Sequence, residues 1–474
     1  MIPPLPEDIF ITIFQYLSLQ DVLSMRMVCK SFKDMTHLRG LWMLILRKEV
    51  WGRNIPSRQI DIERLSTAEI EKLVARSLRL RRNWTSESPK AVRRRHVMVA
   101  MPRARITSLH FIALEGSPCL LSFSLTRRVE PRTMTVECWD LSSLRCKARR
   151  TMQWFGGYAV NSDPESTGII AIKAPYVEIL AFDPSASNPE SAFIPLITLD
   201  ISAKSILFLS GTTMIFRTMN NELKILDILR PSYAIRLEDS QPFEAILHDE
   251  YAIILRPKTL ALYVLKAFRS GSHPPSISLS PVQVHEFQWR IDSCIMRRQI
   301  YPSALLSSDE SKPSNLNILI RYSSLFPWPV NLLHHFILYP NHSYISSASV
   351  TSNNLPYNFP PVLSQTIVSP VRLFAITNMA LGTNGTAVWF DSHTDYHGEV
   401  GQRLAGLMLG FSKEKEETRS EDGTAADQVS TTASMVFGAH VMDDWNTMAI
   451  DEGEGCIAVG SMAGEIFVED YMEK

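Results

Sequence analysis

The hydrophobic period changes once along the chain. Before about residue 85, apolar residues recur at three- and four-residue intervals, which predicts amphipathic helices. From about residue 106 the interval becomes two, which predicts β-strands. The pattern therefore predicts a small helical region followed by a much longer β-rich region.

Four short helices are predicted before residue 50. The first begins beside Pro6, because a proline in the first turn of a helix loses no hydrogen bond. The second begins after Ser18, which forms a capping-box pattern with Asp21. Two more are predicted near residues 28–38 and 41–46. Helices this short bury little core, so several apolar side chains should be covered either by a partner or by the rest of the chain.

A longer helix is predicted over residues 60–82, where a basic stretch begins. From Arg76 to Arg105 there are nine arginines and one lysine against a single acid, Glu87. A phosphate or nucleic-acid contact is one interpretation. A solvated helix face and linker, with arginines paired to acids elsewhere, is favoured. Aromatic interleaving in this stretch is limited to Trp84, and the charge of the whole chain is balanced.

The β-rich region repeats. Three steps from an apolar residue to aspartate, at Asp140, Asp183 and Asp227, lie 43 and 44 residues apart. Such a period, with several strands in each unit, is typical of a β-propeller blade. Two β-sandwiches are the alternative. Seven hairpins are predicted, by residue number: 120–125 with 133–140, 169–174 with 176–183, 214–218 with 222–227, 251–256 with 260–265, 316–322 with 332–339, 372–377 with 385–391, and 456–460 with 464–470.

Three segments should interrupt this repeat. Residues 269–281 and 302–315 are rich in serine and proline, which predicts loops. Residues 412–427 are dense in charge and lack large apolar residues, which predicts a mobile loop within the last repeat.

Residues 5–42 carry a specific resemblance. The order Leu5-Pro6-x-Asp8-Ile9-x-x-x-Ile13-Phe14-x-x-Leu17-Ser18-x-x-Asp21-x-Leu23-x-x-Arg26-x-Val28-Cys29-Lys30-x-Phe32, followed by Leu41-Trp42, resembles an F-box. It covers about a tenth of the chain. Together with the WD-like Trp139-Asp140 step, it resembles fungal-type F-box proteins with a β-repeat domain, although the Gly-His half of the WD signature is missing.

The resemblance implies a substrate-receptor subunit of an SCF-type ubiquitin ligase. The F-box would bind a Skp-type linker subunit and, through it, a cullin, while the β-domain would bind an unidentified target protein. Such a subunit would be non-catalytic. A non-degradative scaffold with an F-box-like cap is the alternative. The residues that match the family's docking and motif-core positions are Leu5, Pro6, Ile9, Leu17, Val28, Cys29, Lys30, Phe32 and Trp42.

The expected fold class is α+β and multi-domain. We expect an all-α F-box domain over residues 1–50 and a helical, basic linker over residues 51–100. An all-β repeat domain, a β-propeller of about seven blades, should occupy residues 101–474, with the charged insertion near residues 412–434.

Composition narrows the class of function. The 474 residues carry a formal net charge of −1, which predicts no general attraction to nucleic acid or to an anionic membrane. Six dispersed cysteines without a CxxC pair fit a reducing compartment. With no signal-peptide pattern and no long apolar run, we expect a cytoplasmic or nuclear protein.

Candidate chemistry is sparse. No phosphate-binding, nucleophile-elbow or zinc-protease motif occurs, so neither a cofactor nor an enzymatic activity is predicted. Asp391, His393, Asp395 and His397 alternate and could share one side of a strand as metal ligands, but a polar loop after a strand is favoured. Two further candidates are set aside: the adjacent residues 334–335, which should face opposite sides of a strand, and Cys138, which should be a core residue.

Overall fold

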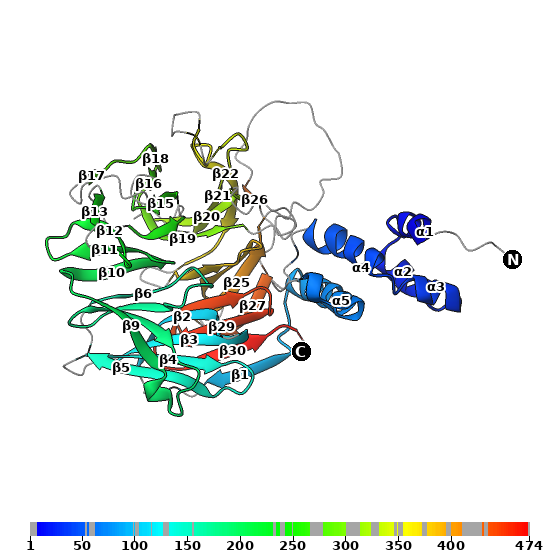
Figure 1. Cartoon of the computed structure of the whole chain (residues 1–474), viewed down its shortest axis with the longest axis horizontal. Coiled ribbons are helices and arrows are strands. Elements are labelled where there is room, and N and C mark those ends of the chain that lie inside the picture. Colours follow the sequence, from blue (N-terminus) through cyan, green and yellow to red (C-terminus); the bar gives the residue numbers. More distant parts are fainter. Residues whose placement is uncertain are drawn as a thin grey trace.

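The computed structural model places a group of helices beside a ring of β-sheets (Figure 1). The structure describes residues 7–52, 55, 62–97, 99, 104–114, 116–126, 132–153, 156–230, 234–237, 242–248, 250–265, 278–299, 313–323, 331–345, 348, 354–371, 377–394, 400–409, 429–430 and 435–472.

The helical region begins with four short helices and ends with a long one. Ser18 caps the second helix and Ser66 caps the last, each through a complete capping box, so the box predicted at Ser18 and Asp21 is confirmed. The last helix, predicted over residues 60–82, begins at Thr67, after a separate 3₁₀ turn, and ends two residues beyond its predicted end. The elements are α1 (Glu7–Phe14), α2 (Leu19–Met25), α3 (Lys30–Met35), α4 (Arg39–Ile45), a π-helical turn (Leu46–Trp51), a 3₁₀ turn (Ile62–Arg64) and α5 (Thr67–Trp84).

Seven separate sheets form the β-region, which confirms the predicted propeller and its blade number. Blade 1 holds β2 (Arg105–Leu114), β3 (Ser117–Leu125), β4 (Thr133–Asp140) and β5 (Cys146–Gln153). Blade 2 holds β6 (Tyr158–Val160), β7 (Ile170–Lys173), β8 (Val177–Phe182) and β9 (Phe193–Leu199), with a 3₁₀ turn at Pro189–Ser191. Blade 3 holds β10 (Ala203–Ser210), β11 (Thr213–Thr218), β12 (Leu223–Asp227), β13 (Ala234–Leu237) and β17 (Ser278–Leu279).

The other four blades follow the same plan. Blade 4 holds β14 (Glu244–Leu247), β15 (Tyr251–Leu255), β16 (Thr259–Val264) and β18 (Gln283–Glu286). Blade 5 holds β19 (Ile291–Arg298), β20 (Leu316–Tyr322), β21 (Leu332–Leu338), β22 (Val362–Val368) and β26 (Val429–Ser430). Blade 6 holds β23 (Met379–Leu381), β24 (Thr386–Thr394), β25 (Val400–Met408) and β27 (Met435–His440). Blade 7 holds β28 (Trp445–Asp451), β29 (Cys456–Ser461), β30 (Ile466–Asp470) and β1 (Arg93–Val97).

The ring closes where the two ends of the β-region meet. β1 pairs antiparallel with β30, so residues 93–97 belong to the propeller although the sequence placed them in the linker. Arg95 of β1 donates to Asp470 of β30 and to the carbonyl of Leu141 in blade 1, and both charged side chains are buried. Two chain segments far apart in sequence therefore share one sheet, and these contacts hold the first and last parts of the ring together.

Two blades carry a fifth strand that comes from the next blade. β17 pairs parallel with β13, and β26 pairs parallel with β22. β17 lies in the connection between β16 and β18, and β26 lies in the connection between β25 and β27. Each extra strand covers part of an outer edge that would otherwise expose unpaired backbone groups.

Six predicted hairpins match observed neighbouring strands, and one is wrong. In blade 6 the strand predicted at 385–391 pairs with β23 on one side and β25 on the other. Residues 372–376 of its predicted partner lie outside the described residues. The prediction failed because apolar alternation identifies a strand but not its neighbour. Of the predicted loops, residues 269–277, 302–312 and 412–427 also lie outside the described residues. Ser278 and Leu279, also predicted as loop, form β17. The segment 412–427 lies between β25 and β27 of blade 6 and therefore not in the last blade, where it was predicted.

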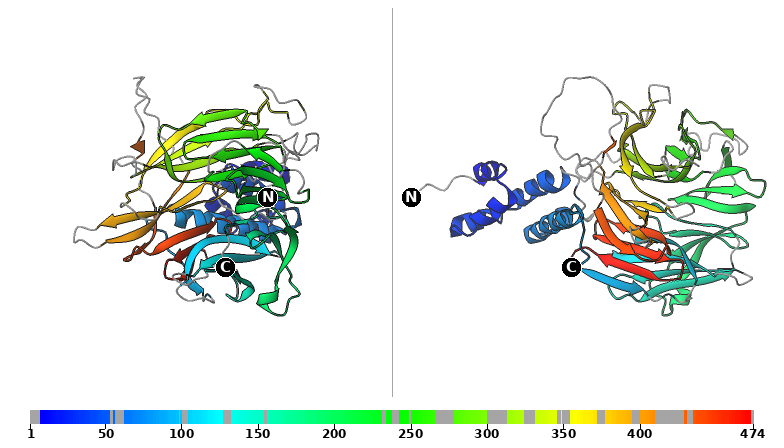
Figure 2. Two further views of the ribbon diagram at one scale, coloured as in Figure 1. Left: turned by 90° about the vertical axis from the view of Figure 1, so that its left-hand side faces the viewer. Right: turned by 180° about the vertical axis from the view of Figure 1, so that it is seen from behind.

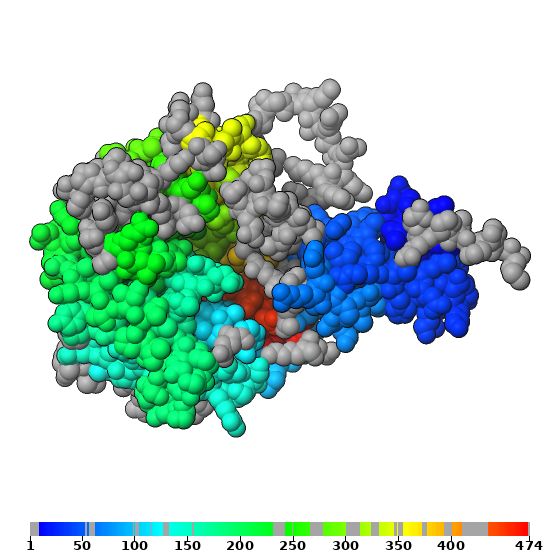
Figure 3. Space-filling model, viewed as in Figure 1, coloured from blue at the N-terminus to red at the C-terminus, as the bar shows by residue number. Residues whose placement is uncertain are grey.

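Helix α5 joins the helical region to the propeller. Its first half, with Ile70 and Val74, packs in the core of the short helices. Its second half, with Leu80 and Trp84, packs in the core of blades 6 and 7. Figures 1 and 2 show α5 against one side of the ring and α1–α3 projecting beyond it, and the space-filling view in Figure 3 shows the same projection. One rigid helix therefore contributes to two cores and holds the two parts in a defined arrangement.

The order of the strands within each blade identifies the face of the propeller that α5 contacts. The first strands of neighbouring blades contact one another around the centre. Strands within a blade alternate in direction, so all turns from first to second strand lie on one face. Arg76 and Leu80 of α5 contact Glu454 and Gly455, which lie in such a turn. We call this the helix face. The second-to-third turns and the links between blades lie on the opposite, distal face.

Candidate docking site

The first three helices expose a group of large apolar side chains. Met27 is 88% exposed, Tyr16 is 81% exposed and Val28 is 65% exposed. A monomeric protein rarely leaves so many neighbouring apolar side chains in water. We call this group the apolar helical surface; its members are Ile9, Ile13, Tyr16, Leu23, Met27 and Val28.

The opposite side of the same helices is a packed core. Phe10 and Phe14 of α1 are buried, with their ring centroids 5.9 Å apart, and Phe10 also meets the edge of Phe32 at 6.1 Å. α1 therefore alternates between inward phenylalanines and outward isoleucines, as expected for side chains three and four residues apart. The exposed isoleucines are not needed for this core, which leaves them available for a second surface.

Trp42 lies at the centre of the core and not on the surface. Its side chain is buried, and its indole nitrogen donates to the carbonyl oxygen of Thr36 at 2.8 Å. The guanidinium of Arg26 lies over the ring, 5.4 Å from its centroid. The same guanidinium makes two parallel hydrogen bonds of 2.6 and 2.8 Å to the carboxylate of Glu71. A buried aromatic ring and a bidentate ion pair thus attach α5 to the short helices.

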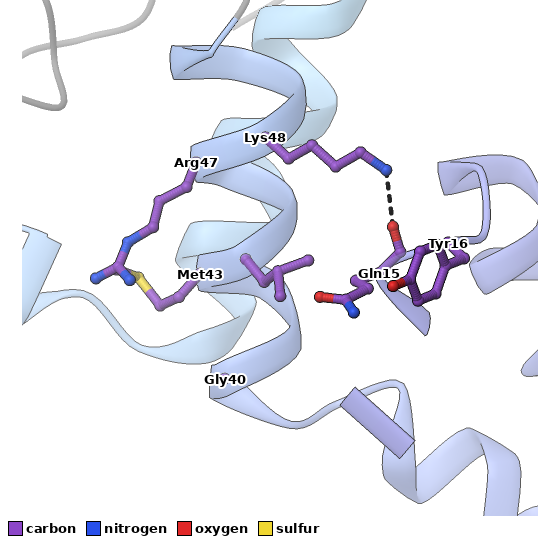
Figure 4. Close-up of a pocket in the computed structure, with 7 residues that line it drawn as sticks. Gln15, Tyr16, Gly40, Met43, Arg47 and Lys48 are labelled. Carbon is purple, nitrogen blue, oxygen red and sulfur yellow. Dashed lines mark hydrogen bonds between the residues drawn. The ribbon is translucent and has the colours of Figure 1, made fainter. Parts of the chain in front are cut away.

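A cleft continues from Tyr16 along α4. It has a volume of about 710 Å³ and lies between the end of α1 and the turn that follows α4. In Figure 4, Lys48 reaches across it and donates to the carbonyl oxygen of Gln15 at 2.7 Å. Arg47 and Lys48 bring positive charge to this cleft, next to the apolar side chain of Met43.

The structure separates the residues that the sequence proposed for docking. Ile9, Val28, Cys29 and Lys30 are exposed, the last three in succession. Phe32 and Leu17 are half-buried against the helical core, and Trp42 is fully buried in it. Leu5 and Pro6 lie outside the described residues. The motif therefore contains both surface residues and residues that shape that surface from beneath.

Sequence reasoning did not single out Tyr16, Met27, Arg47 or Lys48 for docking. Helical spacing could have placed Tyr16 with Ile9 and Ile13, since it continues their side of α1. Nothing in the sequence places Arg47 and Lys48 near Gln15, because they come from another helix.

Three arginines of the basic stretch pair with acids elsewhere in the chain. Arg76 lies 3.0 Å from the carboxylate of Glu454, and Arg94 lies 3.5 Å from that of Glu469. Arg95 pairs with Asp470. These contacts agree with the favoured interpretation of this stretch, in which its arginines meet acids elsewhere in the chain.

The candidate metal ligands do not form a site in the part of the chain that the structure describes. The Asp391 carboxylate is buried and accepts hydrogen bonds from Ser369 and Trp389. Asp395 and His397 lie outside the described residues. Among the described residues there is no group of three or more His, Cys, Asp or Glu side chains placed to hold a metal ion.

The other candidates are structural. His335 is buried and hydrogen-bonds to Asn317, while His334 faces Tyr322, so the two rings do point in different directions. Burial lowers the pKa of His335 to about 4, which keeps its ring neutral. Cys138 is a buried core residue of blade 1. Within the described residues, no helix is both long and apolar enough to cross a membrane.

Comparison with known proteins supports the resemblance of the N-terminal region to an F-box. The family described as F-box-like matches residues 2–48. No curated protein matches the chain significantly. Among solved structures, the WD40 β-propeller domain of Doa1 is similar to 80% of this chain and 97% of its own, with 10% sequence identity and a TM-score of 0.41. The seven sheets described above remain the basis for the propeller.

Proposed function

Because the chain joins an F-box-like region to a seven-bladed propeller, we propose that it is a substrate-receptor subunit of an SCF-type ubiquitin ligase. The F-box-like region docks to a Skp-type linker subunit, which connects it to a cullin. The propeller binds a target protein, and the chain itself catalyses no bond chemistry. F-box proteins are typically non-catalytic ligase subunits, which is what the resemblance implies here.

The apolar helical surface is the observation that carries this proposal. A partner that covers Met27 and Val28 would remove both side chains from water, and burying each would contribute about 1–2 kcal/mol to the free energy of binding. Several such residues together are enough for a stable interface. In this arrangement Ile9, Val28, Cys29 and Lys30 contact the linker subunit, while Phe32 and Trp42 hold those positions in place from the core. Leu5, Pro6 and Leu17 complete the proposed docking segment.

The proposed mechanism is proximity. The ligase transfers ubiquitin faster when the target is held beside the loaded conjugating enzyme, since an encounter in solution becomes effectively intramolecular. A receptor needs a fixed spacing between its two binding sites for this purpose. Helix α5 offers such a fixed spacing, because Ile70 and Trp84 pack in two different cores of the same molecule.

The docking step is tested by co-purification of the full chain with a Skp-type linker subunit. The variant Ile13→Glu with Val28→Glu places two carboxylates on the exposed apolar surface without altering a buried residue. We expect its affinity for the linker subunit to fall by about 100-fold or more, because two charges would be desolvated at the interface. Asp34→Ala is the matched control, since it changes an exposed polar residue of α3.

Two further results decide the assignment. The variant Leu5→Ala with Pro6→Ala should also weaken the association. If both double variants bind the linker subunit as tightly as the unaltered chain does, while circular dichroism shows intact helices, the docking assignment is wrong.

A separate measurement distinguishes a receptor from a non-degradative scaffold. Protein half-lives are compared in cells that carry the unaltered chain or the Ile13→Glu, Val28→Glu variant. A receptor predicts that at least one protein bound to the propeller lives longer in the variant cells. If every bound partner keeps its half-life, the scaffold is the correct assignment.

A further inference from the structure

The propeller has a cationic pocket between blades 2 and 3. It has a volume of about 380 Å³. Its walls come from the turn after β7, the link between β9 and β10, and the turn after β11. The residues that carry the argument are Lys173, Pro175, Ile201, Lys204 and Met219.

Among the described residues, neither lysine of this pocket pairs with a carboxylate. The Lys173 ammonium donates to the carbonyl oxygen of Pro175 at 2.6 Å, and the Lys204 ammonium donates to the amide oxygen of Asn221 at 2.8 Å. Neither ammonium has a carboxylate oxygen within 4.0 Å among the described residues. Each lysine thus has hydrogen-bond donors left for an anionic ligand.

Asn221 holds Lys204 in position before any ligand arrives. Its backbone φ is 65°, in the left-handed region, where asparagine is one of the few tolerated residues besides glycine. This conformation forms the tight turn between β11 and β12. The hydrogen bond to Asn221 restrains the ammonium of Lys204, so this ammonium loses less freedom when a ligand binds.

Apolar side chains surround the two charges. Met219 is 65% exposed. Ile201 and Pro175 supply apolar walls. A flexible, exposed thioether is typical of surfaces that anchor an apolar side chain of a partner.

The pocket opens on the distal face, away from the helices. Two of its walls are second-to-third turns and the third is a link between blades. All such turns lie opposite the first-to-second turn that contacts α5. A ligand in this pocket therefore does not compete with the helical region for space.

We infer that this pocket binds an acidic segment of the target protein, in which carboxylate side chains flank an apolar residue. The two lysines bind the carboxylates, and the apolar residue packs between Met219 and Ile201. This inference rests on the proposed function, because it names the chemistry that the propeller would recognise in its target.

The pocket would bind an anion through lysines alone. Among the described residues that line it there is no arginine, so the fork that binds carboxylate or phosphate with two parallel hydrogen bonds is missing, and each lysine acts as a point charge. Asp and Glu are the anionic side chains that an unmodified protein segment supplies. No aromatic ring lines it either, as stacking of nucleic-acid bases would require. The acids nearest to the lining residues along the chain are Glu178, Asp200 and Glu222, and none of them lines the pocket. Glu178 pairs with Arg150, and Glu222 lies 3.7 Å from Lys224.

The test is a selection from a displayed library of random linear peptides against the full chain bound to its linker subunit. We expect enriched peptides to carry Asp or Glu on both sides of an apolar residue. Their affinity for the variant Lys173→Glu with Lys204→Glu should fall by about tenfold or more, because two attractions become repulsions. Lys258→Glu, which reverses an exposed charge in a second-to-third turn of blade 4, should leave their affinity unchanged.

Two outcomes would overturn the inference. One is enrichment of peptides without an excess of acidic residues. The other is equal binding of acidic peptides to the unaltered chain and to the Lys173→Glu, Lys204→Glu variant. Asn221→Gly keeps the turn but releases Lys204, and should weaken binding by a smaller factor of about two to five. Binding of the linker subunit is measured in parallel, so a failure of the docking proposal is seen independently of a failure at this pocket.

Discussion

Replacing Trp84 by alanine should release the propeller from the helical region. Trp84 ends α5, and its side chain is fully buried in the core of blades 6 and 7. The ring meets the edges of Phe437 at 6.0 Å and Tyr471 at 6.1 Å. These contacts exist only while α5 lies against the helix face, so Trp84 contributes directly to the free energy of that docking.

The size of the effect follows from the burial. Removing a fully buried tryptophan side chain costs about 3–5 kcal/mol, from lost transfer energy and the cavity left behind. An α5 that is less firmly docked by this amount should open more often by a factor above about 100, because 1.4 kcal/mol corresponds to tenfold. Trp84→Phe should cost far less. It keeps the aromatic contacts and removes an indole N–H that has no acceptor among the described residues.

Trypsin cleavage after Lys90 measures this opening. The side chain of Lys90 is exposed, but its backbone is held in place by two hydrogen bonds of 2.8 Å with the Asn83 side chain at the end of α5. The bond is therefore cut mainly when α5 undocks, and the rate follows the population of the open form. We expect cleavage of Trp84→Ala to be faster by more than about 100-fold and that of Trp84→Phe by less than about tenfold. A change below about fivefold for Trp84→Ala would refute the view that α5 couples the two parts.

Three further predictions concern buried charge. Arg26→Ala should weaken the attachment of α5 to the short helices by about 2–3 kcal/mol, which is measured as faster hydrogen exchange in α5. Arg26→Lys should not restore the attachment, because an ammonium cannot make both bonds to Glu71. Arg95→Leu should lower the free energy of unfolding of the propeller, measured in urea, by about 3–5 kcal/mol, because it leaves Asp470 buried without its partner. Adding Asp470→Leu should recover most of the lost stability. If the double variant is as unstable as the single one, the unpaired Asp470 is not the cause of the loss. Burial raises the pKa of Glu244 from 4.5 to about 7, against the opposing charge of Arg297, so its stabilising contribution is present below pH 4.5 and is lost as the pH rises toward 7. Glu244→Gln should remove up to about 2 kcal/mol of this decline in urea unfolding, and equal slopes in both proteins would contradict the assignment.

The candidate docking site was only partly visible in the sequence. The F-box motif drew attention to Val28, Cys29 and Lys30, and all three are exposed. The same motif includes Phe32 and Trp42, which lie inward. A motif records which residues are retained together, and residues that shape a surface are retained along with residues that form it. Burial, which depends on where each helix packs, separates the two groups.

Local rules determined much of this protein from its sequence. The capping box at Ser18, the helical stripe of α1 and the period-two strands all depend on residues a few positions apart. A repeat of 43 and 44 residues was enough to indicate blades, because each blade is one local unit. The predicted number of blades agrees with the seven sheets.

The tertiary structure decided what depends on contacts between distant residues. It placed β1 beside β30, added β17 and β26 to the edges of neighbouring blades, and offset the strand pairing in blade 6. It also brought Lys173 and Lys204 together from different blades. Strand patterns do not specify their partners, because backbone hydrogen bonds carry no side-chain identity. Which surfaces meet is chosen by packing of the whole chain, and in this protein that choice created both candidate binding surfaces.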